Sequence, residues 1–259
     1  MNFTVCIKQV PDVDVPAHIL NGEIVQKTPR LILNVYDATA LEEALVITEA
    51  EGGEVDVVLI GPEKAREAIR KALAMGADRG THILVEHAEQ LDAHAVSRIL
   101  AAYFRTVPHE AILCGKQAQD TDSGLTGTML AELLSLPYVS NAVGIYIDGN
   151  ELVVTRQGDT SQEIVQLPVP GLVACSNNMN DPRIPNLGSI MRSKRKPVTT
   201  LTLSDLGLEG DFGPEYTPRV QVTSYQDLPA RPPATIWEEE TPAMVSNLTQ
   251  VLVEDARVI

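Results

Sequence analysis

The chain has 259 residues, 44% of them hydrophobic, with a mean hydropathy near zero and a formal net charge of −15. This length suits one large domain or one domain with an appendage, and no apolar run approaches the roughly 20 residues that cross a bilayer. The negative charge disfavours nonspecific binding to nucleic acid, which needs Lys and Arg to neutralise phosphates, and it disfavours an anionic membrane surface as a partner.

The first half of the chain alternates between strand-like and helical runs. Four short apolar runs predict buried strands, at residues 4–8, 55–60, 82–86 and 111–114. Apolar positions at helical spacing predict the alternating helices, the first from Asp37 as N-cap to Gly52 and the others at residues 63–75, 92–104 and 124–134. Repeated β-α units of this size predict a parallel sheet with helices on both faces.

After Pro137 the pattern changes to shorter alternating runs, at residues 141–147, 151–155 and 163–167. Two turn signals separate these runs and predict hairpins, Asp148 followed by Gly149 and Gly158 followed by Asp159. One more buried strand is predicted at residues 171–175. The predicted fold is therefore α/β, doubly wound and mainly parallel, with an antiparallel extension of the same sheet.

The composition shifts again from Leu201. Prolines and acidic residues dominate there, and such a segment buries too little apolar surface to fold alone. Thr241 as N-cap and Pro242 at the first helical position predict a short terminal helix. An apolar stripe along this helix needs another surface to cover it, and consists of Met244, Val245, Leu248, Val251 and Leu252. We expect an α/β domain at residues 1–200 and an extended arm at residues 201–259; the alternative is a helix that packs back on its own domain.

The segment at residues 115–132, GKQAQDTDSGLTGTMLAE, connects the fourth predicted strand to its helix through small residues. A strand that turns in this way into a helix leaves backbone N–H groups aimed at one spot, with the positive end of the helix dipole behind them. Phosphate is the natural occupant of such a spot, and in doubly wound sheets ligands bind beyond the carboxyl ends of the strands. The segment therefore predicts a phosphate-binding site, with an ordinary tight turn as the alternative.

Several motifs of catalytic and metal-binding proteins are missing from the sequence. No GxGxxG follows the first predicted strand, and neither GxxxxGK[ST] nor GxSxG occurs. Cys6, Cys114 and Cys175 lie in or beside apolar runs without CxxC spacing, so we expect reduced core thiols. The five histidines form neither HxxxH nor HExxH, and we expect no metal site and no catalytic residues.

The first residues enter a strand pattern directly, without the charged and apolar regions of a signal peptide. They are not rich in Arg and Ser, as a transit peptide would be. We therefore expect a cytoplasmic, bacterial protein.

Five strings in this order resemble the beta subunit of electron transfer flavoprotein over nearly the whole chain. They are VCIKQVPD at residues 5–12, LEEAL after the turn at 34–37, IRKALAMGADRG at 69–80, GKQAQDTD at 115–122 and NDPRIPNLGSIMRSKRKP at 180–197. The resemblance implies an α/β sheet of the Rossmann-like, adenine-nucleotide alpha-hydrolase-like kind. It also implies a heterodimer in which the alpha subunit holds most of a redox-active FAD and this chain closes one side of the flavin site.

The implied function is that of an electron carrier without turnover of its own, because the redox chemistry belongs to the flavin. By the resemblance, the carrier accepts electrons from flavin dehydrogenases such as acyl-CoA dehydrogenases. It passes them through a quinone-linked oxidoreductase toward the quinone pool. Neither nucleic acid nor direct membrane insertion is expected.

The resemblance further implies one structural AMP in this chain. Its contacts, carried over position by position, would be Cys6, Asn34, Val35, Tyr36, Asp37, Ile60, Thr121, Asp122, Ser123, Gly124, Leu125, Thr126, Gly127, Thr128, Met129, Leu130, Ala131 and Glu132. Two departures from the family's pattern bear on the side-chain contacts to the nucleotide rather than on the backbone contacts. Val35 stands where many members have Pro, and Gly124 with Leu125 stands where Asn-Gln is usual.

Two alternatives to the AMP-binding carrier stay open. In electron-bifurcating relatives the same pocket holds a second FAD, and those relatives usually carry Arg at the position of Lys116 and Val-Gly-Pro at residues 126–128. Lys116 and Thr128 therefore favour AMP. An alternative of a different class is a nucleotide-binding hydrolase or sensor module, since this sheet topology also hosts ATP-cleaving enzymes and stress proteins.

Residues 180–197 match the family's recognition arm for partner dehydrogenases. Leu187 matches the leucine that anchors the arm in an apolar pocket of the dehydrogenase, and Arg192 and Arg195 belong to the cationic run that follows. An apolar anchor ringed by charge suits a selective, transient interface. The alternative is a solvated basic loop with Leu187 folded back on the domain. In the same family the C-terminal arm wraps around the alpha subunit, which is the role implied for residues 201–259.

Overall fold

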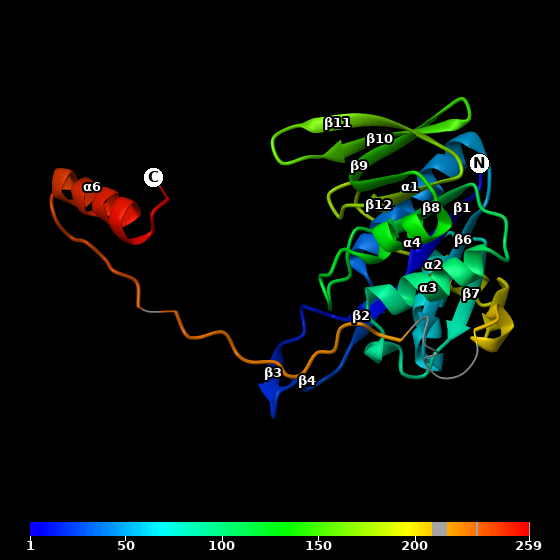
Figure 1. The fold of residues 1–259 in the computed structure, drawn as a ribbon, viewed down its shortest axis with the longest axis horizontal. Coiled ribbons are helices and arrows are strands. Elements are labelled where there is room, and N and C mark those ends of the chain that lie inside the picture. The colour runs from blue at the N-terminus through cyan, green and yellow to red at the C-terminus, as the bar shows by residue number, and fades with distance from the viewer. Residues whose placement is uncertain (209–216, 232, 259) are drawn as a thin grey trace. The chain divides into compact units, whose positions relative to one another are not determined.

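A computed structural model describes residues 1–208, 217–231 and 233–258 of the chain. The chain divides into two compact units, Met1–Ser224 and Tyr225–Ile259, which are described separately. The first unit holds the sheet and its covering helices (Figure 1).

Within the described residues the main sheet of the first unit has nine strands. In spatial order they are β11 (Gln162–Pro168), β10 (Glu151–Gln157), β9 (Tyr138–Asp148), β12 (Gly171–Cys175), β8 (Ala111–Gly115), β1 (Phe3–Ile7), β6 (Val55–Gly61), β7 (Arg79–Leu84) and β13 (Val198–Leu201). The pairs from β9 to β13 are all parallel, whereas β10 and β11 join β9 as antiparallel hairpins. Every residue of β1 and β12 is buried, as expected for parallel strands covered on both faces.

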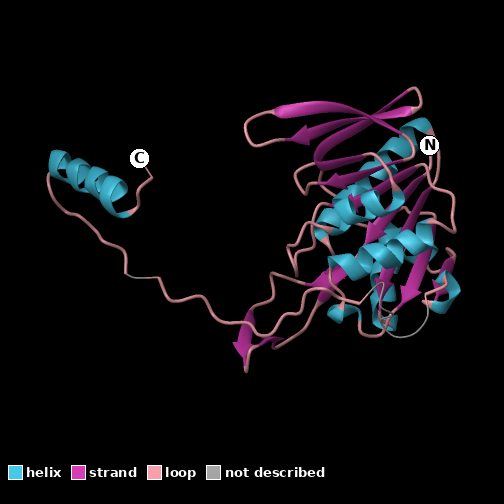
Figure 2. Ribbon diagram, in the orientation of Figure 1, coloured by secondary structure: helices cyan, strands magenta, loops and turns pink. Residues whose placement is uncertain are grey.

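Helices cover both faces of this sheet (Figure 2). On one face lie α1 (Val35–Glu51) and α2 (Arg66–Met75), the latter preceded by the 3₁₀ turn η1 (Glu63–Ala65). On the other face lie α3 (Ala93–Phe104), preceded by the 3₁₀ turn η2 (Ala88–Gln90), and α4 (Thr126–Leu134). The predicted doubly wound α/β fold and its antiparallel extension are therefore confirmed.

The chain reverses its direction of winding between β1 and β8. From β1 it proceeds outward to β6 and β7, and it then returns through α3 to β8 on the opposite side of β1. The two connections that leave these strands lead to helices on opposite faces, α1 after β1 and α4 after β8. This is the topological switch point of the sheet, where doubly wound proteins bind their ligands.

Several elements differ from the sequence-based expectation. Strand β7 begins at Arg79 rather than near residue 82, because Arg79 and Gly80 add register pairs with β6 without being large and apolar. Asn34, not Asp37, lies at the N-cap position of α1, because Asp37 turns its carboxyl group inward to the strand ends. Five strands were not predicted, namely β2 (Gln9–Pro11), β3 (Ala17–Leu20), β4 (Glu23–Gln26), β5 (Leu31–Leu33) and β13. Three short helical elements were also missed, namely η2, α5 (Leu187–Ser193) and the 3₁₀ turn η3 (Ser204–Leu206).

The first unit ends in an extended segment. The backbone N–H groups of Arg219 and Val220 donate to the Asp92 carboxylate, at 2.6 and 3.0 Å. The same carboxylate caps α3 by accepting from Ala95 N–H at 2.8 Å, so the predicted helix start at residue 92 is confirmed.

The second unit contains the predicted terminal helix. Helix α6 (Thr241–Gln250) has Glu240 rather than Thr241 at its N-cap position and continues as the π-helical turn η4 (Val251–Asp255). None of the residues of α6 is buried in the part of the chain that the structure describes. Among the described residues, no helix is both long and apolar enough to span a membrane.

Candidate functional site

At the switch point, one carboxyl group joins the ends of two strands. The backbone N–H of Lys8, just after β1, donates to Asp37 Oδ2 at 2.8 Å, and the N–H of Gly115, at the end of β8, donates to Asp37 Oδ1 at 3.0 Å. Gly115 lies so close to α1 that a Cβ atom there would fall 2.5 Å from Tyr36 Cβ and 2.5 Å from Asp37 Oδ1. The start of α1 is therefore held tightly against the carboxyl ends of β1 and β8.

Burial changes the degree to which Asp37 is ionised. Burial raises the pKa of Asp37 to about 7, although hydrogen bonds from Asn34 and from the N–H groups of Lys8 and Gly115 act in the opposite direction. At neutral pH this carboxyl group is therefore only partly ionised. An anion bound nearby would meet less repulsion from Asp37 than from an ordinary aspartate.

The loop between β8 and α4 is fixed to the start of α1. The buried Asn34 side chain donates from Nδ2 to the carbonyl of Gln117 at 2.9 Å and accepts from the N–H of Gln119 at 3.2 Å. The Lys8 ammonium pairs with Asp120 at 2.7 Å. Asp122 and Gly124 have positive φ angles of 52° and 62°, which turn the chain toward α4. The loop is therefore shaped by contacts with β1 and α1 rather than by its own sequence alone.

Two helix N-termini beside these strand ends lack side-chain caps. The first N–H groups of α4, those of residues 126–128, form no hydrogen bond with any residue that the structure describes, and no side chain caps this helix at Leu125. In α1 the Asn34 side chain is engaged elsewhere, and the N–H groups of residues 35–37 likewise have no partner among the described residues. By contrast, Asp92 caps α3 and Asn186 caps α5. Free N–H groups and the positive ends of two helix dipoles favour an anionic group here.

The remaining predicted contacts surround the same edge of the sheet. Cys6 lies beside Cys114 in the register of β1 and β8, and burial raises the pKa of the Cys6 thiol well above its usual value. Cys6 shares one hydrophobic cluster with Leu130 and Ala131, and Ile60 packs against it. The more exposed predicted residues are Val35, Thr121, Asp122, Ser123, Leu125, Thr128 and Glu132. The structure thus brings the predicted residues together, but it buries the side chains of Leu130 and Ala131 in the core.

Gly127 allows α4 to approach the sheet. A Cβ atom at this position would lie 2.9 Å from Cys114 Sγ, and further atoms of Tyr138 and Ala174 lie within 3.7 Å. The glycine is needed for close packing of the helix on β8, since its φ angle is not in the left-handed region.

The predicted docking segment, residues 180–197, contains a helix where a loop was expected. Leu187 is the first residue of α5, with 77% of its surface exposed, and Asn186 caps this helix by accepting from Ser189 N–H at 2.9 Å. Ile184, at 89% exposure, lies just before it, and Arg192 and Arg195 are exposed as well. Leu187 is therefore not folded back on the domain.

Charged side chains fix this segment to the fold through contacts that the sequence did not predict. The Arg183 guanidinium donates to Glu42 at 2.9 Å and to Glu49 at 3.0 Å, both on α1. At the other end, Arg70 on α2 donates to the carbonyl of Ser193 at 2.8 Å, and Lys196 donates to the carbonyl of Gly76 at 2.8 Å. Arg183 and Glu42 are separated by 141 positions, so no local sequence signal could have paired them.

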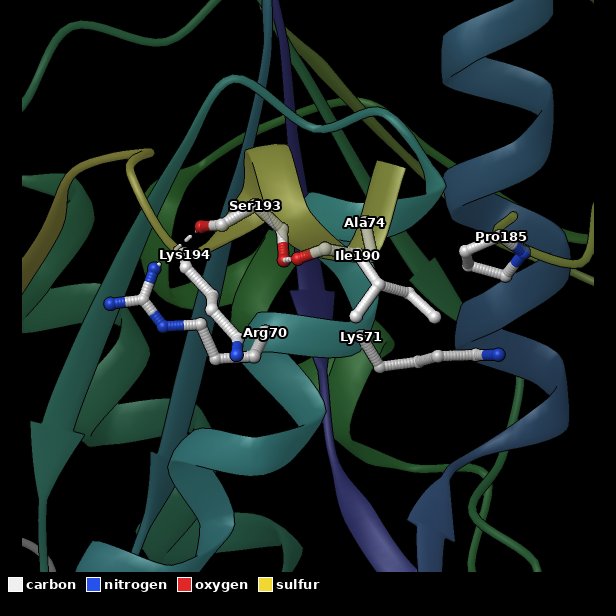
Figure 3. A pocket seen from close by; sticks show the side chains of 7 residues that line it. All are labelled: Arg70, Lys71, Ala74, Pro185, Ile190, Ser193 and Lys194. Carbon is white, nitrogen blue, oxygen red and sulfur yellow. Dashed lines mark hydrogen bonds between the residues drawn. The ribbon is translucent and has the colours of Figure 1, made fainter. Parts of the chain in front are cut away.

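Two cavities lie outside the switch point. One of about 500 Å³ lies between α2 and α5, with residues of the docking segment in its wall (Figure 3). The other, of about 430 Å³, is polar and includes Lys116 and Asn141, whose side chains are joined by a hydrogen bond of 3.3 Å. Among the described residues, no group of three or more His, Cys, Asp and Glu side chains is placed to hold a metal ion.

These features define a doubly wound, Rossmann-like α/β protein with two open helix termini at its switch point. The sequence model of the Electron transfer flavoprotein domain matches residues 22–206. The chain is 30% identical over 260 residues to the electron transfer flavoprotein subunit beta of Bacillus subtilis, covering 100% of both chains. It is 35% identical to the subunit beta of Bradyrhizobium diazoefficiens, covering 96% of this chain and 97% of that one.

The chain therefore belongs to the electron transfer flavoprotein family, as one of its beta subunits. The resemblance read from the five sequence strings is confirmed. A further relative, 37% identical over 212 residues and matched over 80% of both chains, is the caffeyl-CoA reductase-Etf complex subunit CarD of Acetobacterium woodii.

Proposed function

We propose that this chain is the beta subunit of a cytoplasmic, heterodimeric electron carrier in a bacterium, with one structural AMP at the switch point. Its alpha subunit would hold most of an FAD, which supplies the redox chemistry when bound. The carrier would take electrons from acyl-CoA-type flavin dehydrogenases and deliver them to a quinone-linked oxidoreductase. This chain would contribute binding and positioning, without turnover of its own.

The observation that carries the AMP proposal is the pair of uncapped helix N-termini beside β1 and β8. The free N–H groups of residues 126–128 and 35–37 match the acceptor oxygens of a phosphate. A partly neutral Asp37 is compatible with an anion next to it. Ile60 is half-buried against the apolar cluster that contains Cys6, and it would offer a surface on which a base could pack. The residues present therefore fit a nucleoside monophosphate.

A second candidate is a carrier that holds a second FAD in place of AMP. The likeness to CarD favours it, since that relative is named as a subunit of a caffeyl-CoA reductase-Etf complex. Lys116 and Thr128 favour AMP, because bifurcating relatives usually carry Arg and Pro at these positions. The Lys116 side chain is also directed to Asn141 rather than to the start of α4.

The ligands of the purified complex distinguish these candidates. The chain is co-expressed with its alpha subunit, the complex is denatured, and the released ligands are separated and quantified. We expect one FAD and one AMP per heterodimer. Two FAD molecules would support the second candidate, and a stable, colourless homodimer that cleaves ATP would contradict both and support a hydrolase.

The proposed docking of a dehydrogenase depends on Leu187. Replacing Leu187 with Ala removes an exposed apolar anchor while leaving the fold intact, so we expect slower reduction of the complex by an acyl-CoA dehydrogenase and unchanged FAD and AMP content. Reduction at the wild-type rate would contradict this docking role.

A further inference from the structure

The cavity between α2 and α5 is apolar inside and cationic at its edge. Ala74, Pro185 and Ile190 supply apolar walls, and Arg70, Lys71 and Lys194 bring their alkyl stems and charges to it. In Figure 3, Ile190 lies in the middle, with Pro185 on one side and with Arg70 and Lys194 on the other. The cavity has a volume of about 500 Å³, large enough for a bulky side chain.

The walls of this cavity are held in place by hydrogen bonds. The Arg70 guanidinium donates to the carbonyls of Ser193 and Lys196, at 2.8 and 3.1 Å, and thereby joins α2 to both ends of the last turn of the docking segment. Ser193 is itself buried and donates from its hydroxyl to the carbonyl of Ile190 at 2.9 Å. A side chain that enters the cavity would therefore meet a preformed surface, which lowers the entropy that binding must overcome.

The charge around the cavity is opposite to that of the whole chain. The net charge is −15, yet residues 183–197 contain arginines and lysines and no acidic residue. In the part of the chain that the structure describes, neither Lys71 nor Lys194 forms an ion pair. A cationic patch of this kind selects an acidic partner surface and speeds encounter with it.

The cavity is continuous with the exposed apolar residues of the docking segment. Leu187 and Ile190 lie on the same short helix, the first pointing to solvent at 77% exposure and the second lining the cavity at 43% exposure. A partner that covers Leu187 would therefore also cover the mouth of the cavity.

We propose that this cavity receives an apolar side chain, flanked by carboxylates, from the dehydrogenase that docks on Leu187. Each partner then inserts one apolar side chain into the other, and the lysines at the cavity edge face the flanking carboxylates. This inference rests on the proposed docking role of residues 180–197. It adds that the docking surface of the dehydrogenase carries an apolar side chain flanked by carboxylates.

The test measures the second-order rate at which an acyl-CoA dehydrogenase, reduced with its acyl-CoA substrate, reduces the heterodimer. Ala74→Leu fills the cavity and should slow this rate about tenfold at both low and high salt, because insertion is lost. Lys71→Glu reverses one edge charge and should slow it about tenfold at low salt and less at high salt. Lys27→Glu makes the same change of charge at an exposed lysine that does not line the cavity; it is the control and should stay within about twofold of wild type.

The possible outcomes distinguish the cavity proposal from the proposed docking role of Leu187. If Leu187→Ala slows reduction while Ala74→Leu does not, the cavity proposal is overturned and docking stands. If Lys71→Glu and Lys27→Glu behave alike, the acidic character of the partner is overturned. Wild-type rates in all variants, Leu187→Ala included, overturn the docking role itself. Should Ala74→Leu lower the melting temperature, Ile190→Ala replaces it, since this residue is half-exposed and its truncation removes a wall of the cavity.

Discussion

Asp37 joins two strand ends through one buried carboxyl group, and its ionisation should therefore affect stability. Burial raises the pKa of Asp37 to about 7 in the folded chain, compared with its usual 3.8. The folded state then binds the proton more strongly than the unfolded state. The resulting stabilisation is fully present below about pH 4 and is lost as the pH rises through about 7, by an amount on the order of a few kcal/mol.

Asp37→Asn removes this titration. We expect the variant to lack one acceptor for the N–H groups of Lys8 and Gly115 and to be less stable than wild type at pH 5. The difference in melting temperature between the two heterodimers should shrink between pH 5 and pH 8. Melting curves over this range provide the measurement, and parallel pH profiles for both proteins would contradict the raised pKa.

Replacing Gly127 with Ala adds a single carbon atom and provides a second test, of the proposed phosphate site. In Gly127→Ala the new Cβ would lie 2.9 Å from Cys114 Sγ, so α4 must move away from β8 and carry its free N–H groups with it. We expect destabilisation of about 1–3 kcal/mol and reduced AMP occupancy. Gly144→Ala is the matched control, because its Cβ would meet Thr155 only at an ordinary 3.8 Å. Full AMP occupancy in Gly127→Ala would count against the proposed phosphate site.

The sequence identified the residues of the switch point but not their contacts. Asn34 and Asp37 were expected as a turn former and a helix cap, whereas their hydrogen bonds reach residues 83 and 78 positions away. Such pairings arise only when β1 and β8 become neighbours in the sheet. The strand-to-helix segment at residues 115–132 could be located because small residues and glycines have a local signature.

At the scale of elements, the buried strands could be predicted from the sequence, whereas short, exposed strands were missed. The strands β1, β6, β8 and β12 lie in the interior and appear in the sequence as continuous apolar runs. The hairpins among β9, β10 and β11 have turn residues that mark them. Strands β3 and β4 are short and mostly exposed, so neither periodicity nor composition distinguishes them from a loop.

Helix α5 is held by contacts of the docking segment with two other helices, α1 and α2, and Arg183 makes the contacts with α1. Arg183→Ala removes its bonds to Glu42 and Glu49, so residues 180–187 should exchange their amide hydrogens faster. We expect reduction by the dehydrogenase to slow about threefold to tenfold, because Leu187 is no longer held in one orientation. FAD and AMP content should not change.

Arg156→Ala is the matched control for this substitution, since it breaks another Arg–Glu pair, with Glu163 on the antiparallel hairpin. It should leave both the exchange of residues 180–187 and the rate of reduction at wild-type values. Faster exchange in Arg183→Ala together with an unchanged rate of reduction would show that Arg183 does not position the docking segment for electron transfer.

At the scale of the whole molecule, each of the two compact units has a surface that its own residues leave exposed and that suits a partner. One is the cationic docking segment with Leu187 and the neighbouring cavity. The other is the apolar stripe of α6, where Val245 and Leu248 are 58% and 48% exposed. Amphipathic helices are stabilised mainly by packing of their apolar face, so α6 needs a partner surface. The beta-subunit family makes the alpha subunit the expected partner.

Substitutions on the two sides of α6 test this assignment. Leu248→Asp places a charge in the apolar stripe and should weaken association with the alpha subunit about tenfold or more, because burial of a leucine contributes roughly 2 kcal/mol. Ser246→Asp introduces the same charge at an exposed polar position of the same helix and should have little effect.

Removal of residues 241–259 should weaken association at least as much as Leu248→Asp. Size-exclusion chromatography and a subunit titration measure the effect, and a truncated chain that still forms the heterodimer at wild-type affinity would refute the role of the arm.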